Sequence, residues 1–274
     1  MPSLPRWLAR PLFYLALGVY AWLLILPLLS LLSASFRSEA DLYTPGLWPP
    51  QPTLEAYREA VQKHPVGRYL LNSLLVSLSI TLGVLFTSAT LGYALARIRF
   101  AGQKLLFGFV VAVLLIPDEV TFLPRYLLVQ QLGWINSYAA LIVPFLASPL
   151  GIFLLRQFLK SLPQDLFDAA RIDGAGHLRT LWHVALPLAA PALGALGALS
   201  FLGAWNMYLW PLVVVNQNQM KTAQVAIAQV QSVEVSSWNV VAAVAILVLL
   251  PTLLAFLLAQ RTFIRGIALG GLKG

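Results

Sequence analysis

Residues 161–187 read SLPQDLFDAARIDGAGHLRTLWHVALP, a polar segment between the apolar runs 138–156 and 187–215. Four further apolar runs occupy residues 11–34, 69–96, 105–128 and 239–259. A helix that crosses a bilayer needs about 20 mostly apolar residues. The sequence therefore predicts an all-α, polytopic membrane protein, with six transmembrane helices in a single transmembrane domain, residues 1–274.

The composition agrees with a membrane protein. Of the 274 residues, 59% are hydrophobic and only 10% are charged, whereas about 25% of a soluble domain is charged. The chain has no cysteine, which excludes a disulfide scaffold, and its apolar content excludes disorder. The net charge of +8 comes from basic residues that lie singly at the ends of apolar runs. That distribution follows the positive-inside rule and argues against binding to nucleic acid.

The distribution of basic residues also predicts the orientation. Most of the 18 basic residues fall on the cytoplasmic side if both termini are cytoplasmic. The first run resembles a signal peptide, because Arg6 and Arg10 precede it and 33–35 reads SAS. Its apolar stretch is longer than the roughly 7 to 15 residues of a signal peptide, which favours an uncleaved anchor over cleavage.

Three longer segments connect the runs. Residues 36–68 form an outer segment in which Thr53–Tyr57 indicates the start of a short capped helix. Residues 214–238, rich in Gln and Asn, form a second outer segment. In this orientation residues 157–186 form the only long cytoplasmic loop.

The cytoplasmic loop predicts two short helices. Ser161 and Gln164 have the spacing of a capping box, so the first helix is expected to begin near Leu162. Gly174 suits a left-handed helix end. A second helical stretch is expected from His177 to Val184, before Pro187 begins the fifth span.

The first of these helices has the composition of a docking element. Ala169 and Ala170 give it a small-residue side that another protein's backbone can approach closely, and Asp168 and Arg171 flank that side with charge. The periodicity alone equally allows an amphipathic helix that lies in the membrane interface.

The loop resembles the membrane subunits of bacterial ABC importers, whose coupling loop reads E-A-A, three residues, G, nine residues, I-x-L-P. Here 168–170 reads DAA, Gly174 follows three residues later, and 184–187 reads VALP after nine more. Asp for Glu and Val for Ile are the two departures, and the shorter carboxylate puts its contact with the partner in doubt. The phrases AWNMYLWP at 204–211 and FIRG at 263–266 resemble the carbohydrate-uptake branch, above all maltose-type and glycerol-3-phosphate permeases.

The resemblance implies a type I importer permease of the bacterial inner membrane, which pairs with a second, different permease to line one pathway. Two ATP-binding subunits would lie beneath the pair, and an extracytoplasmic solute-binding protein would deliver a sugar or sugar-like solute. Glycerol-3-phosphate or a related polyol phosphate is the alternative solute. The residues implied in coupling to the ATPase are Asp168, Ala169, Ala170, Arg171, Asp173, Gly174, Ala175 and Pro187. The tail 267–274 would reach the ATPase interface, or would simply fray.

The chain itself is predicted to be a transport subunit and not an enzyme. It has no G-x-x-x-x-G-K-[ST] phosphate loop, so ATP and Mg²⁺ would be used by the partner subunits and no cofactor would be bound here. Its three histidines, His64, His177 and His183, are isolated and predict no metal site.

Polar groups inside the apolar runs are the candidates for the solute pathway, because burying them in lipid costs free energy. The third run contains Asp118, Glu119 and Arg125, and it is interrupted by Pro117 and Pro124. A straight helix would separate Asp118 from Arg125 by about 10 Å, which is long for a direct pair, although the prolines can alter it. A water-filled pathway or the second permease is the preferred environment, and a structural ion pair is the alternative.

The fifth run adds Trp205, Asn206 and Tyr208, whose aromatic faces and amide suit sugar rings. Trp210 is expected in the outer aromatic belt, among membrane lipids. Gly194, Ala195, Ala198 and Gly203 allow close packing, expected against the second permease.

Two other functions remain open at this point. A secondary carrier that works alone would carry an internal repeat, and the sequence has none that we detect. An anchoring subunit without transport activity would also explain a docking loop.

Overall fold

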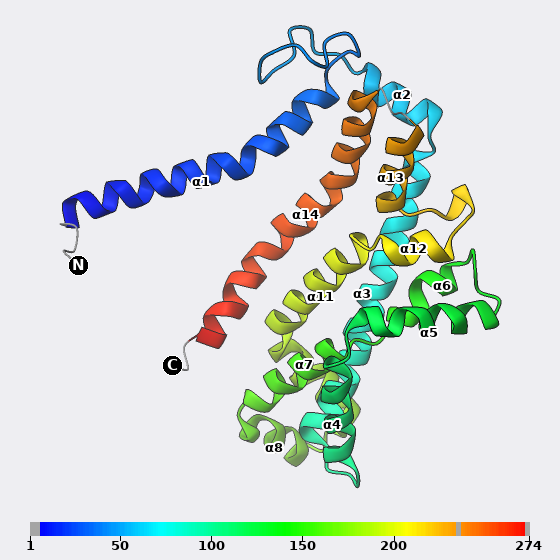
Figure 1. Cartoon of the computed structure of the whole chain (residues 1–274). Coiled ribbons are helices and arrows are strands. Elements are labelled where there is room, and N and C mark those ends of the chain that lie inside the picture. The colour runs from blue at the N-terminus through cyan, green and yellow to red at the C-terminus, as the bar shows by residue number, and fades with distance from the viewer. Residues whose placement is uncertain (1–5, 234–236, 272–274) are drawn as a thin grey trace. The chain divides into compact units, whose positions relative to one another are not determined.

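The computed structural model describes residues 6–233 and 237–271. Over these residues the regular structure is entirely helical (Figure 1), which confirms the predicted all-α class. In chain order the elements are α1 (Arg6–Ser35), α2 (Glu55–Lys63), α3 (Val66–Arg97), α4 (Gln103–Leu114), α5 (Asp118–Gln131), α6 (Tyr138–Ile142), η1 (Val143–Phe145), α7 (Pro149–Ser161), α8 (Gln164–Ile172), α9 (His177–Thr180), η2 (Leu181–Ala185), α10 (Leu186–Leu188), α11 (Ala190–Trp205), α12 (Leu209–Val214), η3 (Asn218–Met220), α13 (Ala223–Val233) and α14 (Trp238–Gly271).

The apolar helices agree with six spans. Four helical stretches are long and apolar enough to cross a membrane, namely Arg10–Ser35, Val66–Arg97, Tyr138–Ser161 and Trp238–Leu257. Two bent pairs reach the same length when each pair is taken as one span. They are α4 with α5, bent by 101°, and the stretch His177–Leu188 with α11, bent by 79°. Neither the third nor the fifth predicted run is therefore one straight helix, and the number of spans is six only if each bent pair crosses the membrane as one span.

The chain forms two compact units. One comprises the residues up to Val66 together with Ile227–Leu249, and the other comprises Gly67–Ala226 and the residues from Leu250 onward. The candidate sites lie in the second unit.

Buried Arg37 organises the outer segment of the first unit. Its guanidinium donates to the backbone carbonyls of Asp41 (2.9 Å) and Thr44 (2.7 Å), so the loop that follows α1 is gathered around one side chain. The hydroxyl of Thr53 accepts from the amide of Glu55 (3.2 Å) at the start of α2. The predicted short helix is thus confirmed, and it extends to Lys63.

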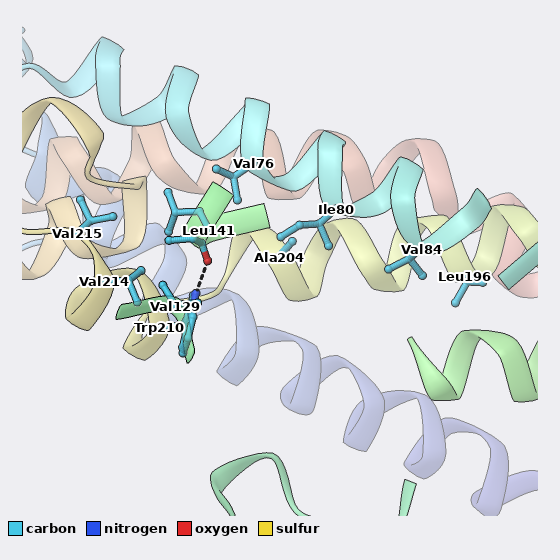
Figure 2. Packing of buried hydrophobic residues seen from close by; sticks show 11 residues of the cluster. Val76, Ile80, Val84, Val129, Leu141, Leu196, Ala204, Trp210, Val214 and Val215 are labelled. Atoms are coloured by element: carbon cyan, nitrogen blue, oxygen red, sulfur yellow. Dashed lines mark hydrogen bonds between the residues drawn. The ribbon is translucent and has the colours of Figure 1, made fainter. Parts of the chain in front are cut away.

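The core of the second unit surrounds α3. Val76, Ile80 and Val84 of α3 pack with residues of α5, α6, α11 and α12 (Figure 2). The indole of Trp210 donates to the carbonyl of Ala140 (2.9 Å), shown as the dashed line in Figure 2. Because Trp210 is only 3% exposed, its predicted place in the aromatic belt is wrong. The helix ends at Trp205 and restarts as α12, which turns Trp210 into the core.

Small residues allow α3 and α7 to approach closely. A Cβ atom on Gly92 would lie 3.2 Å from the backbone nitrogen of Arg156 and 3.3 Å from Cβ of Leu155. A Cβ on Gly151 would collide with the hydroxyl of Ser88. The two helices are therefore in backbone-level contact, which is the packing that small residues provide between membrane helices.

Candidate functional site

The helix α8 begins later than the capping box predicted. Its first residue is Gln164, after Pro163, and no side chain caps it. The hydroxyl of Ser161 instead donates to the carbonyl of Phe158 (2.8 Å), inside the last turn of α7. The capping-box prediction is wrong because the preceding helix extends through Ser161 and uses its hydroxyl.

The helix α8 ends in a left-handed turn at Gly174, as predicted. Gly174 has φ +76°, in the left-handed region. Its amide bonds to the carbonyl of Arg171 (3.0 Å), and the amide of Ala175 bonds to the carbonyl of Ala170 (2.9 Å). These two bonds form a Schellman motif, which ends the helix and reverses the chain. The second helix follows as α9, and the π-helical turn η2 continues it.

The two alanines of the loop face different ways. Ala170 is buried, with 8% of its surface exposed, as is Phe167, which packs with Leu181 and Ala185 of η2. Ala169 is exposed. The expected small-residue side is therefore only half available to a partner, because an i, i+1 pair cannot share one helix face.

Exposed apolar side chains on the same loop were missed by sequence reasoning. Ile172 is 86% exposed, and Leu178 and Trp182 are also exposed. Leu178 and Trp182 are four residues apart, at the junction of α9 and the π-helical turn. The signal was present as apolar residues in a polar loop, but the π-helical turn that contains Trp182 has no sequence signature that we recognise. Asp165, Asp173 and Pro187 are exposed on the same loop.

Arg97, at the end of α3, connects three helices and was likewise missed. Its guanidinium donates to the carbonyls of Leu159 and Leu162 (2.8 Å for Leu162) and to the side chain of Gln164. Its Cζ atom lies 3.8 Å from the centre of the Phe167 ring. A charged donor thus satisfies carbonyls at the end of α7 and holds the first turn of α8 against α3.

The network continues along the outer side of α8. The Gln164 amide donates to Asp168 (3.0 Å), and Asp168 forms an ion pair with Arg171 at 3.8 Å. Both charged side chains of this pair are about half exposed, so the pair contributes little to stability. Their charges remain accessible to a partner.

The second group of candidates comes together at a cavity of about 440 Å³. Five of the six predicted pathway residues line it: Asp118, Glu119, Arg125, Asn206 and Tyr208. The sixth, Trp205, is 1% exposed and stacks on Phe201, with ring centres 5.8 Å apart. Trp205 therefore does not line the cavity. A neighbouring cavity of about 770 Å³ also has Asp118 and Arg125 in its wall.

Aromatic rings surround Arg125 in this cavity. Its Cζ atom lies 4.9 Å from the centre of the Phe145 ring and 5.7 Å from that of Trp210, and its guanidinium donates to the hydroxyl of Thr121 (3.1 Å). It also approaches the carboxylate of Asp118 to 3.7 Å. Side chains on a helix point toward its N-terminus, so the long Arg125 side chain reaches back over two turns. The two residues thus come closer than the distance along a straight helix indicated, and they form the ion pair that was the alternative interpretation.

The amide of Asn206 faces the same cavity. Its oxygen accepts from the side chain of Gln224 (3.0 Å), and Asn206 itself is exposed just after α11 ends. Tyr208 is also exposed. The wall thus combines an amide, a phenol, two carboxylates and a guanidinium with aromatic faces.

Gly203 is exposed, with open space where a Cβ would lie. Among the described residues, His, Cys, Asp and Glu form no group of three that could hold a metal ion. The backbone of α14 continues through Gly271, and residues 272–274 of the predicted tail lie outside the described residues.

Two solved structures have the same fold. One chain of a bacterial ABC transporter involved in the import of the acidic polysaccharide alginate has a TM-score of 0.83 to this chain. The match covers 95% of this chain and 99% of that one at 22% identity. A chain of the alginate transporter in complex with its pentasaccharide-bound periplasmic protein has a TM-score of 0.65 at 15% identity, covering 92% and 93%. The fold is thus that of type I ABC importer permeases, as predicted.

Residues 66–267 match the family described as "Binding-protein-dependent transport system inner membrane component", and the chain belongs to this family. It is 32% identical to the arabinooligosaccharides transport system permease protein AraQ of Bacillus subtilis, over 97% of this chain and 96% of that one. It is 34% identical to AraQ of Halalkalibacterium halodurans, over 93% of both chains. The sn-glycerol-3-phosphate transport system permease protein UgpE of Yersinia pestis is 38% identical over 74% of this chain and 73% of its own length.

The chain is therefore an ABC importer permease of the carbohydrate-uptake branch, in the inner membrane, as the loop pattern predicted. Its relatives are permease subunits, so it is a transport component and not an enzyme. Membership in a binding-protein-dependent family supports a solute-binding protein as a partner, and it argues against the secondary carrier that the sequence left open.

Proposed function

We propose that this permease forms half of a pathway for a neutral sugar or oligosaccharide and couples that pathway to ATP hydrolysis through α8. In this proposal a second, different permease supplies the other half, and two ATPase subunits bind ATP and Mg²⁺. Both termini and the loop 157–186 face the cytoplasm. The observation that carries the proposal is the loop itself, which presents an exposed apolar and charged surface on a helix fixed to α3.

The coupling role rests on the two faces of α8. On its inner face Phe167 packs into the cluster that includes Tyr93 of α3 and Leu155 of α7, and Ala170 is also buried. Its outer face presents Ile172 and the charges of Asp168 and Arg171 to solvent. A helix that is packed on one side and available on the other transmits a displacement of its partner to the spans. A loose interfacial helix would lack the Arg97 contacts that hold α8 to α3.

The solute class rests on the cavity around Arg125. Aromatic faces and an amide are suited to sugar rings, and three of these groups, Asn206, Tyr208 and Trp210, line the cavity. Its two carboxylates outnumber its one guanidinium, so its net charge is negative and disfavours an anionic solute. This charge favours a neutral sugar over glycerol-3-phosphate or another polyol phosphate. The relatives named for arabinooligosaccharides support that choice, whereas UgpE, named for sn-glycerol-3-phosphate, supports the alternative.

The absence of cysteine allows a direct test of coupling. We would introduce a single cysteine as Ile172→Cys, at an 86% exposed position, and compare it with Ala170→Cys, two residues away and buried. In the assembled importer, the cysteine at 172 should react with a thiol reagent from the cytoplasm and crosslink to an ATPase subunit. The cysteine at 170 should do neither to a comparable degree.

Two results would contradict the proposal. Labelling of position 172 only from outside intact cells would reverse the orientation of the loop. Labelling from the cytoplasm without any crosslink to an ATPase subunit would remove α8 from the coupling interface. A transporting permease should co-purify with the ATPase subunits and should also support ATP-dependent uptake in proteoliposomes. A subunit that only anchors would co-purify but would not support uptake.

A further inference from the structure

A basic cavity of about 810 Å³ lies at the ends of α3 and α7, beside the first residues of α4. Gln164, Asp168 and Arg171 of α8 form part of its wall, whereas Ile172 does not line it. Only one carboxylate, that of Asp168, lines it. The basic side chains that line it are those of Arg97, Arg99, Lys104, Arg156, Lys160 and Arg171. Such an excess of positive charge in one cavity favours the binding of an anion.

Two of these cations are already used within the protein. Arg97 is bonded to the carbonyls at the end of α7, and Arg156 donates to the carbonyl of Leu95 (3.2 Å) and lies 3.5 Å from the centre of the Phe107 ring. By contrast, Arg99, Lys104 and Lys160 have no hydrogen bond or ion pair within the part of the chain that the structure describes, and all three are exposed. Their positive charge is therefore available to a ligand.

The cavity borders an exposed apolar helix surface. Lys104 lines it, and the next residue, Leu105, is one of the most exposed apolar side chains of the unit. Phe109 lies one turn further along α4 on the same face and is also exposed. No residue of α4 is buried. An apolar helix surface that begins beside a basic cavity matches a molecule with acyl chains and an anionic head.

We propose that this cavity binds the phosphate-bearing headgroup of an anionic phospholipid, with the acyl chains along the exposed face of α4. Arg99, Lys104 and Lys160 bind the headgroup, and Leu105 and Phe109 contact the chains. Basic pockets between membrane helices on the cytoplasmic side are suited to anionic headgroups, and each Lys or Arg near the membrane surface adds about fivefold to the affinity. Because Asp168 and Arg171 of α8 share the cavity, the lipid would lie against the helix proposed for coupling.

The test is lipid binding to the assembled importer, measured by native mass spectrometry during titration with phosphatidylglycerol or phosphatidylcholine. Phosphatidylglycerol should bind at least about tenfold more tightly. Arg99→Gln and Lys160→Gln should each lower its affinity about fivefold. The control Arg10→Gln removes one charge at an exposed position outside the cavity and should change the affinity by less than twofold.

Several outcomes would overturn the assignment. Equal binding of the two lipids, or equal effects of Arg10→Gln and Lys160→Gln, would remove the headgroup site. Displacement of phosphatidylglycerol by millimolar inorganic phosphate would identify a site for a soluble anion. A crosslink from Lys160→Cys to an ATPase subunit would show that a protein segment fills the cavity. The measurement reads lipid binding alone, so a negative result leaves the coupling role of α8 standing.

Discussion

The guanidinium carbon of Arg97 lies 3.8 Å from the centre of the Phe167 ring, so the last residue of α3 rests directly on the inner face of α8. The same guanidinium satisfies the carbonyls of Leu159 and Leu162. A long span and the proposed coupling helix are thereby joined through one side chain. Any movement of α8 must carry the end of α3 with it or break these contacts.

Replacing Arg97 should therefore uncouple the importer. A hydrogen bond from a charged donor contributes about 1.5 to 3 kcal/mol, and the contact with Phe167 adds about 1 kcal/mol. We expect Arg97→Gln to lower ATP-dependent uptake at least about tenfold in proteoliposomes, the loss that corresponds to one such bond. Basal ATP hydrolysis should continue but respond less to the loaded binding protein.

The conservative variant Arg97→Lys distinguishes position from charge. A lysine at this position would retain the charge, but its ammonium lacks the planar guanidinium that donates to the two carbonyls and to Gln164 at once. The variant should therefore recover only part of the uptake. Full uptake by Arg97→Gln, with normal stimulation of ATP hydrolysis, would show that α8 needs no such connection to α3.

The left-handed turn after α8 gives a second prediction. Gly174 has φ +76°, and no atom lies within 4 Å of the position of a Cβ. Gly174→Ala should therefore act through backbone strain of about 1 to 2 kcal/mol and not through a collision. Association of the ATPase subunits, measured by titration of the reconstituted permease, should weaken about five- to thirtyfold.

Gly176 provides the matched control. It has equally open surroundings, but its φ is −70°, which any residue adopts. Gly176→Ala should leave the association unchanged, and Gly174→Asn should fall between the two alanine variants because Asn tolerates the left-handed region. Equal effects of the two alanine variants would mean that association of the ATPase subunits does not depend on the left-handed turn.

Most of the fold was predictable because it depends on apolar runs and local turns. The runs at 11–34, 69–96 and 239–259 each correspond to a long helix. The turn at Gly174 was predictable because only a residue tolerant of positive φ ends a helix in this way. The bends in the third and fifth runs were not predictable, because Pro117 indicates a break in the helix but not the angle of the bend.

The candidate site was predictable as a set of residues but not as a geometry. Charged side chains cost free energy in lipid, so Asp118, Glu119 and Arg125 are conspicuous in an apolar run. Only the folded chain brings Asn206 and Tyr208 to the same cavity. Arg97 gave no signal of its own, because a basic residue at the end of a span is ordinary. Its role depends on contacts with residues more than 60 positions away.

The contact of α3 with α7 gives a third prediction. Gly92 faces the backbone of Arg156, where a larger side chain would force the helices apart. Overpacking of this kind costs about 1 to 3 kcal/mol. We expect Gly92→Leu to lower the thermal midpoint of the detergent-solubilised importer by several degrees.

Gly108, on α4, is the control because nothing lies within 4 Å of its Cβ position. Gly108→Leu should leave the midpoint within about one degree. If Gly108→Leu destabilised the importer as much as Gly92→Leu, the effect would come from the leucine and not from the close approach of the two helices.

The cavity around Arg125 gives the fourth prediction. Asp118 is 95% exposed at its side chain and Arg125 only 24%, so the ion pair contributes little to stability but leaves the carboxylate open to a solute. Replacing both carboxylates, Asp118→Asn with Glu119→Gln, changes the net charge of the cavity from negative to positive. We expect an unchanged thermal midpoint but a preference shifted toward anionic sugars, because the electrostatic penalty on them is removed.

The shift is measured as uptake of a neutral sugar against a sugar phosphate or sugar acid, with the cognate binding protein present. A matched double variant outside the cavity, Glu55→Gln with Glu59→Gln on α2, should leave the ratio unchanged, because it removes the same charge from a helix that does not line the cavity. If uptake and preference both stay as they are after the change at 118 and 119, neither carboxylate faces the solute. The pair of Asp118 with Arg125 would then be a structural contact at the start of α5, and Asn206 and Tyr208 would remain the candidates for contact with the sugar.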